Sequence, residues 1–295
     1  MVQPVIIEAA INGATKKDRN PNVPVSPEEI AADALACLEA GASIVHAHCD
    51  PPGGPDDEVA ERYLAAFRPV WEARFDALLY PTVNFGAGGL SFGHLEIMRK
   101  EGLRIGLLDP GSVNLGRLGP DGLPAGAFVY ANSFDRIAEV FALHDSLGLG
   151  PSLAIYEPGF LRATISYWRA GRLPAGTMIK LYLAEDRGYM GAPFGLPVTP
   201  LGLEAYLEIL GDCPVPWAVS AVGGDLGRSP VASLALARGG HLHLGLEFFG
   251  AYGDRAPTNV SLVREAVALC EAAGRPVASC AEAAEILALP PLSES

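Results

Sequence analysis

The sequence is 295 residues long, 49% of them hydrophobic, and its formal net charge is -13. This length allows one large core, and so acidic a chain is a poor candidate for nucleic-acid binding, which depends on clustered Lys and Arg. The five cysteines are scattered without a Cys-x-x-Cys motif, which predicts a reducing, cytoplasmic compartment. We expect no membrane partner, because no apolar run approaches the ~20 residues of a membrane span and the N-terminus does not resemble a signal peptide.

Apolar runs that end in Gly, Asn or Pro recur along the chain and predict β-strands. The predicted strands are residues 5–10, 43–48, 78–84, 103–108, 152–156, 177–183, 217–222 and 242–247. Helical patterns follow at residues 26–41, 57–75, 92–101, 133–147, 159–170, 201–210, 230–238 and 259–273, and a last helix is predicted at 280–287. Ser26, Pro27 and Glu29 have the pattern of a capped helix start, whereas Pro69 predicts a kink or break in the second helix.

This alternation of strand and helix predicts parallel strands joined by crossover helices. About eight units in this length favour an α/β fold of the (β/α)8 TIM-barrel type, with a doubly wound open sheet as the alternative. Residues 1–295 are expected to form this single domain with its C-terminal helix. Dinucleotide binding has little support, because no Gly-x-Gly-x-x-Gly motif follows the first strand. Active sites of such barrels lie at the C-terminal ends of the strands, where polar residues become functional candidates.

His46 and His48 stand at the end of the second predicted strand. Residues two apart in a strand point to the same side, so both imidazoles can bind one metal ion; the alternative is a pair of ordinary polar residues. A third ligand is commonly a carboxylate, and Glu247 ends the eighth strand. In a closed barrel the second and eighth strands both flank the first, which predicts a metal site at His46, His48 and Glu247.

A second His-x-His motif, His241 and His243, offers the alternative metal pair. At about 3.3 Å per residue, His243 lies about 13 Å from Glu247 along the strand, too far for the two to share a metal. We expect a structural role for His241 near the barrel floor. His243 has the same facing as Glu247, so it is a candidate for substrate contact inside the barrel.

Polar residues also stand at other strand ends, namely Asn84, Ser112, Glu157, Glu185 and Asp225. Helix capping or loop hydrogen bonding is the ordinary role of such a residue taken singly. Glu8 and Glu157 stand out because they lie where apolar residues dominate, and a carboxylate there must be paired, bind a metal or have a shifted pKa. They are the candidates for catalysis, and Asn84 and Ser112 are candidates for substrate binding.

Several segments match the pattern of a known family. They are residues 6–14 (IIEAAINGA), 24–30 (PVSPEEI), 39–48 (EAGASIVHAH), 156–159 (YEPG), 245–247 (GLE) and 274–278 (GRPVA). As a set they span nearly the whole chain and resemble the β-keto acid cleavage enzymes. The resemblance implies a TIM barrel that is usually oligomeric, so we expect a homo-oligomer.

The resemblance also implies a reaction and a cofactor. A divalent metal, typically zinc, would be held by His46, His48 and Glu247 and would polarise the ketone of the substrate. The family reaction converts a β-keto acid and acetyl-CoA to acetoacetate and a new acyl-CoA. Cationic side chains that could meet the CoA are Lys16, Lys17, Arg19, Arg117, Arg162 and Arg187.

The chain departs from the family pattern where proton transfer is expected. Phe248 replaces an aspartate next to the metal-binding glutamate, and His243 replaces an arginine. Further departures are Thr15 for an acidic residue, Asp50 for an arginine and Asn84 for a serine. Because phenylalanine cannot transfer a proton, Glu8 and Glu157 are the remaining carboxylates, and Glu157 matches a substrate-binding position. The alternative function is therefore a metal-binding relative with altered or lost cleavage activity that acts on or binds another small carboxylate.

Overall fold

The computed structural model describes residues 2–13, 15–86, 89–186, 188, 191–248 and 255–291. Its main sheet runs in the order β3-β2-β1-β15-β14-β12-β11-β6, with all neighbours parallel. The strands are β1 (Ile7–Ala10), β2 (Ile44–His46), β3 (Leu78–Tyr80), β6 (Ile105–Leu107), β11 (Gly150–Ile155), β12 (Met178–Ala184), β14 (Trp217–Val222) and β15 (His241–Leu244). The end strands β3 and β6 contact each other, so the sheet forms a nearly closed barrel and the predicted TIM-barrel fold is confirmed.

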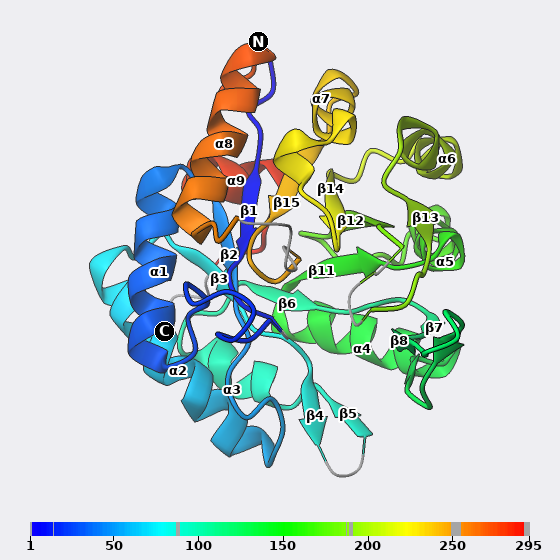
Figure 1. Cartoon of the computed structure of the whole chain (residues 1–295). Helices are drawn as coiled ribbons and strands as arrows, with labels where there is room; N and C mark the ends of the chain where they lie inside the picture. The colour runs from blue at the N-terminus through cyan, green and yellow to red at the C-terminus, as the bar shows by residue number, and fades with distance from the viewer. Residues whose placement is uncertain are drawn as a thin grey trace.

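Helices surround this barrel and lie outside its strands (Figure 1). They are α1 (Pro27–Ala40), α2 (Asp56–Ala73), α3 (His94–Lys100), α4 (Phe134–Leu147), α5 (Pro158–Arg169), α6 (Pro200–Leu210), α7 (Pro230–Ala237), α8 (Asn259–Ala272) and α9 (Cys280–Ile286). The predicted capping box of Ser26 and Glu29 starts α1. Among the described residues, every helix is too short or too polar to span a lipid bilayer.

Pro69 does not interrupt α2, so the sequence-based prediction of a break there is wrong. Proline in a helix interior removes one hydrogen bond and disturbs the preceding turn. Tyr63, Phe67 and Val70 of the same helix are buried against the core, and this apolar packing keeps the helix continuous. Tertiary burial thus outweighs the local preference of the proline.

The barrel strands are buried along their whole length, as expected for parallel strands covered on both sides. Polar residues interrupt these apolar strands in the barrel interior, namely Glu8, Ser152, Lys180, Ser220 and His243. Each of them contacts another member of this set or Tyr80. The interior of the barrel therefore contains a connected polar network.

Short antiparallel pairs extend the loops after β3 and β6 (Figure 1). They are β4 (Asn84–Gly86) with β5 (Gly89–Ser91), β7 (Ser112–Asn114) with β10 (Val129–Ala131), and β8 (Arg117–Leu118) with β9 (Pro124–Ala125), while β13 (Leu196–Pro197) pairs with β12. Segments of two or three residues are too short to show a hydrophobic period, which is why the sequence did not predict them. Residues 78–84, predicted as one strand, are β3, a connection at residues 81–83 and the first residue of β4.

The last barrel strand ends three residues earlier than predicted, and Glu247 lies in the turn that follows it. Gly245 ends the strand because its φ is 143°, a conformation that L side chains rarely adopt. A side chain at Gly245 would also meet the Ala10 backbone of β1 at 2.1 Å. The turn places Glu247 above β1, next to the end of β2.

Candidate metal centre

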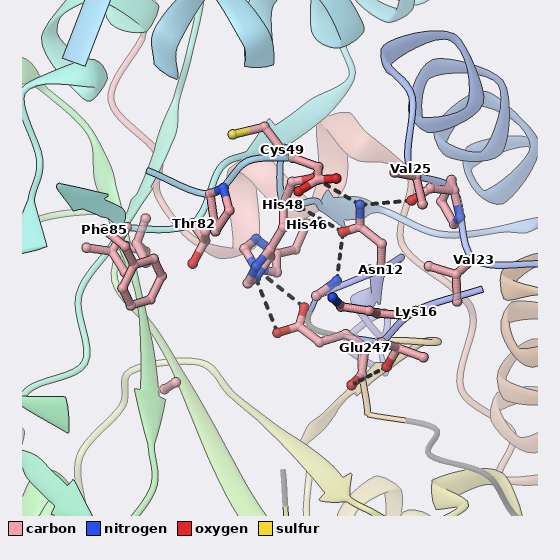
Figure 2. A pocket seen from close by; sticks show the side chains of 18 of the residues that line it. Asn12, Lys16, Val23, Val25, His46, His48, Cys49, Thr82, Phe85 and Glu247 are labelled. Carbon is pink, nitrogen blue, oxygen red and sulfur yellow. Dashed lines mark hydrogen bonds and ion pairs between the residues drawn. The ribbon is translucent and has the colours of Figure 1, made fainter. Parts of the chain in front are cut away.

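His46, His48 and Glu247 come together at the C-terminal ends of strands β2 and β15, which both flank β1. The Glu247 carboxylate oxygens lie 3.5 Å from His46 Nε2 and 3.4 Å from His48 Nε2. The two imidazole Nε2 atoms are 3.1 Å apart. Figure 2 shows both rings and the carboxylate directed at one point. The structure thus assembles the three predicted metal ligands, which we call the trio, from two distant segments.

The trio has the spacing that a bound zinc ion requires. Ligands about 2.1 Å from a tetrahedral zinc ion lie about 3.4 Å from one another. One ligand atom from each residue of the trio lies within 4.8 Å of the other two, and the closest approaches are those just given. Two imidazoles and one carboxylate also form a ligand set that catalytic zinc sites use, with a fourth position left for substrate. The residues present therefore fit a divalent metal ion.

His46 is held in the form that can bind a metal. Burial lowers its pKa to about 3, so the ring is neutral. Its Nδ1 lies 3.2 Å from the carbonyl oxygen of Tyr80, and because a carbonyl only accepts, Nδ1 carries the proton. This tautomer leaves the lone pair of Nε2 directed toward Glu247, which is the arrangement of a metal-binding histidine.

Asn12, Gly13 and Thr15 lie against the other two members of the trio and hold them in place. The Asn12 amide donates to the carbonyl oxygen of His48 at 2.9 Å, and its Oδ1 accepts from the His48 N–H at 2.8 Å. Thr15 donates its hydroxyl to the Leu246 carbonyl at 2.8 Å. Gly13 has a φ of 58°, and a Cβ there would come within 2.3 Å of the Glu247 side chain. Glycine therefore lets this loop approach the carboxylate closely.

A cavity of about 990 Å³ opens beside the trio. Its lining includes the exposed Lys16, Lys17 and Phe85, which form its rim, and Figure 2 shows Lys16 and Phe85 around the trio. Its inner wall includes Tyr80, Asp109, Tyr130, Tyr156, Lys180 and Tyr182. The volume is that of a small-molecule site, with aromatic walls and a few ionisable groups.

Two residues of the inner wall, Tyr80 and Lys180, contact the buried Glu8, which also contacts His243; we call these four residues the floor cluster. The Tyr80 hydroxyl donates to the Glu8 carboxylate, and Lys180 Nζ lies 2.7 Å from the same hydroxyl. Lys180 Nζ and His243 Nε2 lie 3.6 Å and 3.1 Å from Glu8 Oε1. Burial raises the pKa of Glu8 and lowers that of His243, while the Lys180 charge opposes the rise at Glu8.

The remaining predicted site residues are not brought to the trio. The Asn84 amide donates to Gly54 and Asp56, and the Ser112 hydroxyl to Asn132, so both side chains fix loops. Glu157 precedes α5 and accepts from the Gly195 N–H at 2.9 Å. These residues and His243, like Glu8, are not among those that line the cavity. The substrate contacts of Asn84, Ser112 and His243 and the catalytic role of Glu157 therefore remain predictions.

The other histidines and cations also have assigned places. His241 Nδ1 accepts from the Ile6 N–H at 2.9 Å, consistent with the structural role expected for it. Lys16 and Lys17 line the cavity, whereas Arg19, Arg117 and Arg162 do not. Arg187 lies outside the described residues.

Sequence reasoning missed Tyr80, Asp109 and Lys180 as residues of the cavity wall. Lys180 had a usable signal, because a lysine in the apolar run Met178–Ala184 is as unusual as Glu8 in the first strand. Tyr80 looked like an ordinary apolar strand residue. Asp109 precedes Pro110 and Gly111, and this context is typical of a turn.

A parallel barrel with two histidines and a glutamate beside a deep cavity at its C-terminal face defines a TIM-barrel protein with a candidate metal centre. The family follows from comparison with known proteins. The chain belongs to the β-keto acid cleavage enzyme family, whose model matches residues 4–289.

Relatives with assigned names match over almost their full length. The chain is 28% identical over 295 residues to the 3-keto-5-aminohexanoate cleavage enzyme of Acetoanaerobium sticklandii, covering 98% of this chain and 99% of the relative. It is 29% identical over 297 residues to the 3-oxoadipate:acetyl-CoA acetyltransferase of Cupriavidus necator, covering 98% and 96%. A solved structure of ObcA with oxaloacetate has a TM-score of 0.66 at 16% identity, covering 92% of this chain and 68% of that one, which shows a shared fold.

Proposed function

We propose that the protein is a metal-dependent β-keto acid cleavage enzyme that converts a β-keto acid and acetyl-CoA to acetoacetate and a new acyl-CoA. The observation that carries the proposal is the trio beside a large cavity, in a chain of this family. The relative from C. necator has acetyl-CoA in its name, which supports the same co-substrate here. Zinc is the proposed metal, because the ligand set suits it.

A divalent ion held by the trio would act as a Lewis acid on the substrate ketone. Proton transfer needs a group of the chain, and Phe248 cannot supply it. We assign this role to Glu8, because burial raises its pKa and makes it a stronger base than an ordinary glutamate. Tyr80 connects Glu8 to the trio, because its ring stacks on His46 and its hydroxyl donates to Glu8. Glu157 remains the second candidate for this role.

The rim of the cavity is the proposed entrance for acetyl-CoA. Lys16 is exposed there, whereas Lys17 is paired with Glu29 of α1. We assign Lys16 to the CoA phosphates, because the strongly acidic chain otherwise repels them. A homo-oligomeric state remains a prediction from the family.

The test combines metal analysis with a substrate panel. We expect the purified protein to hold about one divalent ion per chain and to form an acyl-CoA from at least one β-keto acid and acetyl-CoA, detected by mass spectrometry. His46→Ala is the matched variant and should lose both properties. A protein with neither bound metal nor turnover of any β-keto acid would contradict the proposal.

One observation favours a second candidate, a metal-binding relative that no longer cleaves β-keto acids. Phe248 is buried and packs edge-on against His243 and Tyr182, with ring centroids 4.7 Å and 5.3 Å apart. The position expected for an acid is thus part of the apolar packing. A double variant with Phe248→Asp and His243→Arg that gains cleavage from none would support this candidate. Ready cleavage by the unmodified protein would exclude it.

A further inference from the structure

We propose that Lys180 is a substrate-binding residue whose ammonium group binds the carboxylate of the ligand at the inner end of the cavity. The proposal rests on the proposed function for the identity of the ligand as a β-keto acid. Lys180 lies in the middle of β12 and is 3% exposed, yet it lines the cavity. Lysine is almost never buried this completely unless it is paired, so its presence here calls for an explanation.

Pairing within the protein accounts for only part of the bonding capacity of Lys180. An ammonium group has three N–H donors. Among the described residues, its acceptors are the Tyr80 hydroxyl at 2.7 Å and Glu8 Oε1, which at 3.6 Å is beyond a good hydrogen bond. A donor thus remains for a group inside the cavity. A buried ammonium gains most from an acceptor that is itself charged, such as a carboxylate.

Lys180 also lies within reach of a ligand that is bound at the trio. The Tyr80 ring stacks on the His46 ring with centroids 4.4 Å apart, and Lys180 Nζ lies 5.0 Å from the centroid of the same Tyr80 ring. Tyr80 therefore contacts both the metal centre and Lys180. A short keto acid along the Tyr80 side of the cavity can place its carboxylate near Lys180 while its ketone faces the trio.

The charges around the cavity favour Lys180 over other cations. Lys16 and Lys17 are exposed at the rim, and no arginine lines the cavity among the described residues. His243 stands where the family resemblance implies an arginine, and its ring faces Glu8 instead of the cavity. Lys180 is therefore the one cation on the inner wall of the described cavity. Its charge on β12 takes the place of the arginine that the resemblance implies at position 243 on β15.

The experiment compares two ligands that differ in one negative charge. Acetoacetate and its neutral methyl ester are titrated into zinc-loaded protein by calorimetry, without acetyl-CoA. We expect Lys180→Met to weaken acetoacetate binding about 10–100-fold, the scale of a lost charge-assisted hydrogen bond, and to leave binding of the ester unchanged. Lys100→Met, on the exposed side of α3, is the matched control and should change neither affinity.

A second variant protects the test against misfolding. Glu8→Gln combined with Lys180→Met removes both buried charges, and it should show the same selective loss of acetoacetate binding. Equal weakening of both ligands would assign Lys180 a structural role and overturn the proposal. Unchanged acetoacetate affinity, no binding by the unmodified protein, or an acetoacetate adduct on Lys180 that borohydride traps would also overturn it.

The binding test separates this inference from the proposed function. Selective loss in a protein that cleaves no β-keto acid would support Lys180 as the carboxylate-binding residue and contradict the cleavage reaction. Cleavage by a protein whose acetoacetate affinity does not depend on Lys180 would support the proposed function and overturn the role of Lys180.

Discussion

The trio and the floor cluster meet where Tyr80 of the floor cluster stacks on His46 of the trio, and they differ in their chemistry. The trio brings together two imidazoles and a carboxylate, three groups that a cation binds, at the ends of strands near the cavity opening. The floor cluster lies inside the strands and pairs an ammonium with a carboxylate of its own. The trio thus presents ligand atoms that fit a metal cation, whereas the floor cluster contains a cation of its own, Lys180.

Removing a member of the trio should have the largest effect. Glu247→Ala leaves two imidazoles, which hold zinc poorly, so we expect the purified variant to contain far less than one zinc ion per chain. Elemental analysis after dialysis measures this directly. Glu96→Ala, an exposed residue of α3, is the control and should keep its metal. Full zinc content in the Glu247 variant would show that the trio is not the metal site.

Substitutions in the floor cluster should change the free energy of unfolding and leave the metal content unchanged. Lys180→Met leaves the Glu8 carboxylate buried without its cation, and we expect the free energy of unfolding to fall by about 3–5 kcal/mol. Adding Glu8→Gln should recover most of this loss, because the buried Glu8 charge that lost its partner is then also removed. Urea denaturation of the metal-free proteins measures both values. Additive losses in the double variant would mean that the two residues are not energetically coupled.

The different positions of the trio and the floor cluster in the barrel explain which of their residues could be predicted from the sequence. The barrel was predictable because apolar runs and helix caps alternate along the whole chain. The trio was predictable because its side chains stand at strand ends, where barrel sites are expected. Lys180 was missed because the rule selects residues at strand ends, and Lys180 lies within a strand. The hydrogen bonds of Asn84 and Ser112 could not be predicted, because their partners, Asp56 at the start of α2 and the carbonyl of Asn132, come near only in the folded chain.

The effect of Asp109 on stability should depend on pH, which tests the electrostatics of the inner wall. Burial raises its pKa from 3.8 to about 6, so the folded protein binds this proton more tightly than the unfolded chain. At 1.36 kcal/mol per pH unit, the buried charge costs about 3 kcal/mol above pH 6 and nothing below pH 3.8. Asp109→Asn should therefore be more stable than the unmodified protein at pH 7 by up to about 3 kcal/mol, with the difference disappearing as the pH falls toward 3.8.

Thermal or urea denaturation of the metal-free proteins between pH 4 and pH 8 measures this difference. The neutral amide still accepts the Ala154 N–H, so that contact is preserved. Asp135→Asn, on the exposed start of α4, is the control and should show no comparable pH dependence. A constant difference at every pH would mean that Asp109 acts through packing and not through its charge.

Asn12 should give the smallest effect, because it bonds to backbone groups of His48 and Gly13 and to no ligand atom of the trio. Asn12→Ala removes both hydrogen bonds to the His48 backbone and leaves every ligand atom in the chain. Loss of a residue that orients a ligand typically weakens metal binding 10–100-fold, and we expect the lower value, about 10-fold, because His46 and Glu247 stay in place. Competition with a zinc chelator measures the affinity, and Asn22→Ala, an exposed asparagine nearby in the sequence, is the control. An unchanged affinity would show that the turn at Gly13 and the packing of residues 44–48 position His48 without Asn12.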